Sequence, residues 1–280
     1  MWYFGTAGTP DGYDGKGSVE YVSWLKTKGL NAFEYQCGRG VRVSAETAAG
    51  LRAEAEKHGV RLSLHAPYFI SLSSVDPQKR LNSVDYIMQS AVAADAMGAG
   101  RIIVHSGSVS GMERGEAVAL AEETLRQALI ALDEAHLGHI IVCPETMGKQ
   151  NQLGTVGEVC AFCKLDERLV PCVDFGHLYA RSLGAVEGYE ASLAVLDEIA
   201  DALGTERMRN LHIHFSHIEF TAGGEKRHLN FRDGQFGPDF EPLCRALEER
   251  GAEPVIISES AGMQDEDALE MKRIHETKQA

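Results

Sequence analysis

In the stretch Leu169-Val170-Pro171-Cys172-Val173-Asp174-Phe175-Gly176-His177, a short apolar run ends abruptly in a carboxylate, and an imidazole follows three residues later. An apolar run of this length, bounded by turn residues, is typical of a buried parallel strand. An acid and a histidine just beyond its end can belong to one cluster, and both can bind a transition metal. Asp174 could equally cap the next helix, with His177 packed beneath it. The same pattern recurs along the chain, and this recurrence favours the cluster.

Short apolar runs alternate with segments of helical periodicity throughout the 280 residues. The expected strands cover residues 2–5, 31–35, 60–64, 101–104, 139–143, 169–173, 210–213 and 254–257. The expected helices cover residues 19–28, 44–57, 80–97, 113–135, 156–164, 186–203, 240–250 and 266–278. Alternation of this kind indicates parallel strands joined by right-handed crossovers. A chain of this size therefore favours an α/β fold with a single closed (β/α)8 TIM barrel, which we expect to form one domain over residues 1–280.

Composition indicates an ordinary water-soluble globular protein, with 44% hydrophobic and 24% charged residues. No apolar run approaches the length of a membrane span, and the N-terminus lacks the basic region and long apolar stretch of a signal peptide. Six cysteines in a chain this long do not form a disulfide framework, and we interpret Cys160 and Cys163 as buried thiols rather than a zinc site. We expect a cytoplasmic monomer that does not associate with membranes.

The net charge is −14, which argues against a broad nucleic-acid-binding face, where a basic stripe is expected. It does not exclude nucleic acid, because metal ions in a pocket can reverse the local charge. Four basic residues in the late loops together favour an anionic substrate, although for any one of them a solvated surface charge is the more common role. These residues are Arg181, Lys226, Arg227 and Arg232.

Histidines or acids stand at the ends of the third to the eighth expected strands. These residues are His65, His105, Glu145, Asp174, His214 and Glu259. Because the carboxyl ends of all barrel strands open on one face, we expect these side chains to converge on one pocket. His177 and His228, from the loops after the sixth and seventh strands, can point into the same pocket. Barrel mouths are polar in many proteins, so any one of these residues alone would indicate little.

Eight candidate ligands exceed what one ion needs, since zinc usually takes three or four protein ligands. The set fits two or three ions, with Glu145 as a bridging carboxylate, and several imidazoles favour Zn²⁺, with Mn²⁺ or Fe possible, over Mg²⁺ or Ca²⁺. Such a pocket could hydrolyse a phosphodiester, or with one or two ions could polarise a sugar carbonyl for isomerisation. The spacing of the residues does not separate these two chemistries.

The ordered set of motifs is similar to that of the endonuclease IV family of apurinic/apyrimidinic endonucleases, in the xylose-isomerase-like barrel superfamily, over essentially the whole chain. The motifs are Leu64-His65-Ala66-Pro67-Tyr68, Ile103-Val104-His105-Ser106-Gly107, Pro144-Glu145-Thr146, Val173-Asp174-Phe175-Gly176-His177, Leu211-His212-Ile213-His214-Phe215, Arg227-His228 and Ile257-Ser258-Glu259. The resemblance implies three zinc ions that cleave the DNA backbone 5′ to an abasic site through a metal-activated hydroxide.

The resemblance also implies a role for each candidate residue. One ion would be held by His65, His105 and Glu145; a second by Glu145, Asp174, His214 and Glu259; and a third by His177 and His228. We expect Glu145 and Glu259 to be the catalytic acids. Tyr68 resembles the family's DNA-probing aromatic residue and Arg39 an inserted arginine, with Lys226 and Arg227 as further substrate-binding candidates; Tyr68 could instead be packed on the barrel rim.

Two positions depart from the family pattern. The family's third ion is held by an Asp-x-His pair, whereas here Lys226 stands two residues before His228, with Glu225 one residue further back. A protonated lysine cannot bind a metal, so either Glu225 reaches the third ion or that site is weak or empty. His217, three residues past His214, stands where the family usually has Asp, and could be an extra ligand or a group that orients a ligand.

Three functions are therefore open at this level. The first is an endonuclease IV-type phosphodiesterase. The second is a sugar isomerase or epimerase on the same barrel, acting on a phosphorylated or free sugar, with Glu145 and Glu259 bridging metals or transferring protons. The third is a non-catalytic metal-binding or interaction barrel, which would bind metal tightly without turnover.

Overall fold

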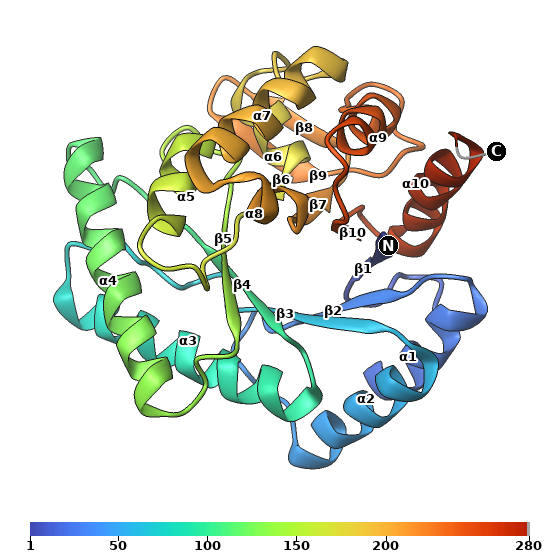
Figure 1. Cartoon of the computed structure of the whole chain (residues 1–280), viewed down its shortest axis with the longest axis horizontal. Coiled ribbons are helices and arrows are strands. Elements are labelled where there is room, and N and C mark those ends of the chain that lie inside the picture. The colour runs from blue at the N-terminus through green and yellow to red at the C-terminus, as the bar shows by residue number, and fades with distance from the viewer. Residues whose placement is uncertain (279–280) are drawn as a thin grey trace.

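Parallel strands close into a barrel in the computed structural model, which describes residues 1–278 (Figure 1). Around the barrel the strand order is β1-β10-β7-β6-β5-β4-β3-β2. The barrel strands are β1 (Tyr3–Ala7), β2 (Ala32–Gln36), β3 (Arg61–His65), β4 (Arg101–His105), β5 (Ile141–Glu145), β6 (Cys172–Asp174), β7 (His212–Phe215) and β10 (Val255–Ser258). The predicted α/β fold with a closed (β/α)8 barrel is thus confirmed.

Helices cover the outside of the barrel between successive strands (Figure 1). They are α1 (Gly17–Thr27), α2 (Ala45–His58), α3 (Pro77–Met97), α4 (Arg114–Glu134), α5 (Val156–Cys163), α6 (Phe175–Arg181), α7 (Gly188–Leu203), α8 (Thr205–Arg209), α9 (Phe240–Glu249) and α10 (Gln264–Lys278). Local chemistry sets several of these boundaries. The hydroxyl of Ser44 caps α2 by accepting a hydrogen bond from the Thr47 N–H, and Gly59 ends the helix in the left-handed conformation.

Two parts of the predicted layout are wrong. The sequence predicts a long loop over residues 215–238, between the expected strand 210–213 and the expected helix 240–250. The segment instead contains an antiparallel hairpin of β8 (Ile218–Thr221) and β9 (Gly224–His228). The sixth strand was expected over residues 169–173, but it covers Cys172–Asp174 and passes directly into α6. His177 therefore lies in the first turn of a helix rather than in a loop, and His228 is the last residue of a strand.

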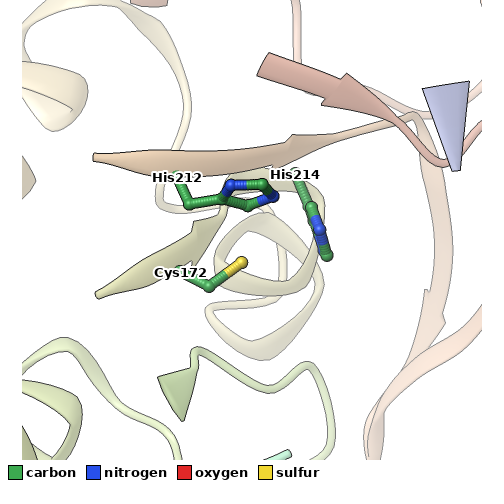
Figure 2. Close-up of side chains that lie close together, drawn as sticks. All are labelled: Cys172, His212 and His214. Carbon is green, nitrogen blue, oxygen red and sulfur yellow. The ribbon is translucent and has the colours of Figure 1, made fainter. Parts of the chain in front are cut away.

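The main hydrophobic core lies between the barrel wall and the surrounding helices. Side chains alternate between this core and the barrel interior because successive residues of a strand point to opposite faces. On β7, Ile213 belongs to the core, whereas His212 and His214 point to the other side of the strand (Figure 2). The cysteines, which all lie in the described residues, are buried and form no disulfide. Residues 1–278 form no helix that is both long and apolar enough to span a membrane.

Candidate metal centre

The predicted ligands gather at the carboxyl ends of the barrel strands. Each of β3, β4, β5 and β6 ends on one of them; these residues are His65, His105, Glu145 and Asp174. His214 is the third residue of β7, and Glu259 follows β10 directly. Strand register places His105 beside Glu145 and Asp174 beside His214. The strand ends therefore bring six side chains, from widely separated parts of the chain, to one rim.

Glu145 lies at the centre of this cluster and is 1% exposed. Its Oε2 lies 3.4 Å from Nε2 of His65 and 3.4 Å from Nε2 of His105. Its Oε1 lies 3.1 Å from Nδ1 of His214 and 3.5 Å from Nδ1 of His177. Each carboxylate oxygen therefore faces a different pair of imidazoles, which is the arrangement that a bridging ligand needs.

Asp174 has two roles that the sequence presented as alternatives. Its Oδ1 accepts a hydrogen bond of 2.7 Å from the backbone N–H of His177, so Asp174 caps α6. Its Oδ2 lies 3.3 Å from Nδ1 of His177 and faces the cluster. The cap fixes the first turn of α6, and this turn directs the His177 side chain toward Glu145.

A third group of donors comes from α6 and the β8–β9 hairpin. His177, Glu225 and His228 offer ligand atoms that all lie within 4.8 Å of one another. Oε2 of Glu225 lies 3.6 Å from Nε2 of His177. Gly148 permits this approach, since a Cβ there would lie 2.6 Å from Cβ of Glu225 and 3.0 Å from Cδ2 of His177. The sequence left open whether Glu225 reaches this group in place of the family's Asp, at whose position Lys226 stands here. In the structure Glu225 lies at the cluster.

The electrostatics of the cluster are those of imidazoles packed around carboxylates. Burial lowers the pKa of His65, but the close negative carboxylate of Glu145 outweighs burial and raises the pKa to about 9. For His177, burial is likewise outweighed by Asp174 and Glu145, and the pKa rises to about 9. His105 is the exception, because burial lowers its pKa to about 4 despite Glu145. Burial raises the pKa of Glu145, but the hydrogen bond with His214 and the nearby His65 ring outweigh burial and hold this pKa well below its usual range.

The donor set fits transition-metal ions. Within the described residues, Oε2 of Glu145 and Oδ2 of Asp174 are buried without a hydrogen-bond partner, and such atoms are costly unless something binds them. Two further groups also have possible ligand atoms that all lie within 4.8 Å of one another. These groups are His65 with His105 and Glu145, and His65 with His214 and Glu259. Imidazole and carboxylate donors together suit Zn²⁺, Mn²⁺ or Fe better than Mg²⁺ or Ca²⁺.

A cavity of about 380 Å³ opens above the cluster. The candidate ligands that line it are His65, His105, Glu145, His177, Glu225, His228 and Glu259. Tyr68 stands at its edge, with 60% of its surface exposed, as a residue that contacts a substrate would. Lys149 also lines the cavity and was not identified from the sequence. It is the one lysine or arginine among the described residues of the lining.

The other predicted substrate-binding residues lie elsewhere. Lys226 and Arg227 form ion pairs with Glu219 at 2.5 Å and 2.7 Å, and neither lines the cavity. Arg39 is exposed, in the loop next to Gly38 of the lining. Arg232 pairs with Glu266. His217 is buried against Phe231, with ring centroids 4.8 Å apart, and is also absent from the lining.

Arg181 supports the cavity from outside. Its guanidinium donates hydrogen bonds to the carbonyl oxygens of Met147, Lys149 and Gln152, at 3.2, 2.7 and 3.2 Å. It was expected to face a substrate phosphate, but it instead holds the loop after β5, which presents Lys149. The positive charge on the cavity wall thus comes from a residue whose backbone is fixed.

Beneath the rim lies a buried polar layer that the sequence analysis missed. Glu34 of β2 is fully buried and lies 2.8 Å from Nε2 of His212. Figure 2 shows Cys172 from β6 with His212 and His214 from β7, and the three offer possible ligand atoms within 4.8 Å of one another. The period-two spacing of His212 and His214 could have indicated that both face the interior. Glu34 gave no such signal, because it stands inside a strand rather than at its end.

Comparison with known proteins gives the family. The family model described as a xylose isomerase-like TIM barrel matches residues 22–276. The chain belongs to this family, in agreement with the resemblance that its strand-end motifs carry. The chain is 29% identical over 276 residues to the uncharacterised protein MJ0133 of Methanocaldococcus jannaschii, covering 99% of this chain and 98% of the relative.

Other relatives are named as endonucleases. A probable endonuclease 4 of Acholeplasma laidlawii is 29% identical over 181 residues, covering 63% of this chain and 59% of the relative. Endonuclease IV from Thermus thermophilus superposes with a TM-score of 0.69 at 22% identity, covering 100% of this chain and 98% of that one. The 3-keto-D-glucoside 4-epimerase YcjR from E. coli superposes with a TM-score of 0.71 at 15% identity, covering 98% of this chain and 100% of that one. Both likenesses concern the fold, and a fold alone does not choose between activities.

Proposed function

We propose that this protein is a metal-dependent phosphodiesterase of the endonuclease IV type, which hydrolyses the DNA backbone at abasic sites. The observation that carries the proposal is the convergence of His65, His105 and Glu145 with six further donors at one rim, and all of these donors except Asp174 and His214 line the cavity. The six are Asp174, His177, His214, Glu225, His228 and Glu259. When bound there, two or three ions would supply charge neutralisation for a phosphodiester and an activated water.

The residues of the chain supply position and charge. Glu145 divides its two oxygens between two pairs of imidazoles, so it would bridge two ions. Glu259 lies 3.5 Å from Nδ1 of His214 and 4.0 Å from Nε2 of His228, between the second and third donor groups. Lys149 would contact a phosphate at the cavity wall, and exposed Tyr68 would contact the nucleotide beside the lesion.

The direct test is incubation of the protein with a duplex that contains one abasic site, in the presence of zinc or manganese and then with excess chelator. We expect a nick at the lesion that chelator abolishes, and no nick in the matching undamaged duplex. Tight metal binding with no turnover of any substrate would favour the non-catalytic barrel instead.

A sugar epimerase or isomerase is the second candidate, and two observations favour it. The cavity of about 380 Å³ suits a monosaccharide. The acids Glu145 and Glu259 both approach the His214 ring, as paired acids that transfer protons would. Conversion of a keto sugar, alongside intact abasic DNA, would select this function and would also remove DNA as the partner.

The third donor group gives a sharp prediction, because its two candidate residues are neighbours. Glu225→Gln is expected to weaken binding of the third ion by roughly 10- to 100-fold, since an amide is a poorer ligand than a carboxylate. Lys226→Ala is the matched control and is expected to leave metal content unchanged, because Lys226 pairs with Glu219 outside the cavity. Elemental analysis after dialysis measures both. Equal metal content in the wild type and in Glu225→Gln would remove Glu225 from the site.

Metal affinity is expected to rise with pH. In the metal-free protein the pKa values of His65 and His177 are raised to about 9, so below that pH each ring holds a proton that an ion must displace. Each displaced proton changes the apparent affinity roughly tenfold per pH unit, so affinity should climb from about pH 6 and level off near pH 9. Titration against a competing chelator at several pH values measures this. An affinity that does not change with pH would contradict the assigned ligands.

A further inference from the structure

Glu34 is a buried carboxylate beneath the proposed metal centre, and it is surrounded by donors. Its Oε2 lies 2.8 Å from Nε2 of His212 and accepts a hydrogen bond of 2.9 Å from the Ser63 hydroxyl. Its Oε1 accepts a hydrogen bond of 3.2 Å from Gln36 and lies 3.0 Å from Nε2 of His214. No lysine or arginine of residues 1–278 pairs with it. Its counter-charge must therefore come from the histidines.

The two nitrogens of the His214 ring point to different partners. Nε2 faces Glu34, whereas Nδ1 faces the rim, 3.1 Å from Glu145 and 3.5 Å from Glu259. A ring nitrogen with a free lone pair would be repelled by a carboxylate oxygen at 3.0 Å, so this distance favours the form of the ring that has its proton on Nε2. Nδ1 is then the nitrogen that can bind a metal once its own proton has left.

We propose that Glu34 is a positioning residue that holds His214 with its proton on Nε2, so that Nδ1 is presented to the ion at the rim. His212 holds the carboxylate from its other oxygen. This inference rests on the proposed metal centre, and adds a residue from β2, which supplies no ligand at the rim. It also explains why a charged group is kept inside the barrel, where an apolar side chain would pack at lower cost.

A competing arrangement uses the same residues differently. Cys172, His212 and His214 could hold an ion of their own in the barrel interior, as their grouping in Figure 2 allows. In that case Nε2 of His214 would bind the ion and could not carry a proton toward Glu34. The two arrangements therefore differ in which His214 nitrogen binds metal and in whether sulfur is a ligand.

The test compares Glu34→Gln with Ser63→Ala. Glutamine keeps the size of the side chain but carries no charge, and its single oxygen cannot accept from both imidazoles. We expect zinc affinity, measured by chelator competition, to fall roughly 10- to 100-fold. Ser63→Ala removes a different hydrogen bond to the same carboxylate without touching His214, and should change the affinity by less than about threefold. Glu34→Asp should recover part of the loss, because it restores the charge.

Two spectroscopic measurements on the wild type do not depend on whether any variant folds. Histidine-selective ¹⁵N NMR of the zinc-loaded protein is expected to show the His214 proton on Nε2 and zinc on Nδ1. The cobalt-substituted protein is expected to lack an intense thiolate charge-transfer band. Zinc on Nε2, or a thiolate band that Cys172→Ser removes, would overturn the proposal. Unchanged affinity in Glu34→Gln would also overturn it. A wild type that binds no metal would instead refute the metal centre itself.

Discussion

Glu145→Gln is expected to lower chelator-sensitive cleavage at an abasic site by more than roughly 100-fold. Glu145 faces His65 and His105 with one oxygen and His177 and His214 with the other, so its loss affects two ion positions together. An amide supplies one weak oxygen donor in place of two charged ones. Steady-state cleavage of a labelled abasic duplex measures the effect.

The fold of the Glu145→Gln variant should persist. The side chain lies at the rim, outside the main hydrophobic core. The histidines around it can also release their protons once the carboxylate charge is gone, so that no buried charge is left unpaired. Circular dichroism checks the fold, and Glu219→Gln, an acid on β8 whose partners Lys226 and Arg227 are absent from the cavity lining, is the control. Wild-type turnover by the Glu145→Gln protein would exclude Glu145 from the mechanism.

Removal of metal is expected to lower the melting temperature by on the order of 10 °C. An ion that binds only the folded state, at a free concentration about a thousandfold above its Kd, stabilises it by about 4 kcal/mol. For a domain of this size each kcal/mol corresponds to about 2–4 °C. Much of this stabilisation would come from partners for the orphaned oxygens of Glu145 and Asp174.

Differential scanning calorimetry of the protein with zinc, and after exhaustive chelation, measures this shift. The Glu145→Gln variant is the control, since it should show a much smaller difference between the two states. Equal melting temperatures of the wild type with and without metal would mean that the rim does not bind ions in the folded protein.

The fold could be predicted from the sequence because the barrel repeats one signal. Each barrel strand is a short apolar run followed by turn residues and a helical segment, so errors at single boundaries did not affect the topology. The clearest errors fell where that signal is weak. The strand β6 has only three residues, and α6 follows it without a loop, so His177 was expected in a loop. The β8–β9 hairpin is short and charged and lacks the alternation of a buried strand.

The residues of the candidate site that stand at strand ends could be predicted from the sequence. Residues in the layer below the rim could not. Barrel topology brings His65 and Glu259 to one rim whatever the side-chain details. Glu34 acts from the layer below, and no spacing rule connects it with His214. Lys149 is positioned by the loop contacts of Arg181, which join residues far apart in the sequence. Lys226 and Arg227 lie outside the cavity lining, where both pair with Glu219 of the same hairpin.

Anomalous diffraction from crystals grown with zinc and manganese tests the metal centre most directly. We predict two or three anomalous peaks in the cavity, one beside His65 and His105 and one beside Asp174 and His214, with Glu145 between them and any third peak beside Glu225. A cavity without anomalous density, in protein saturated with both metals, would contradict the account.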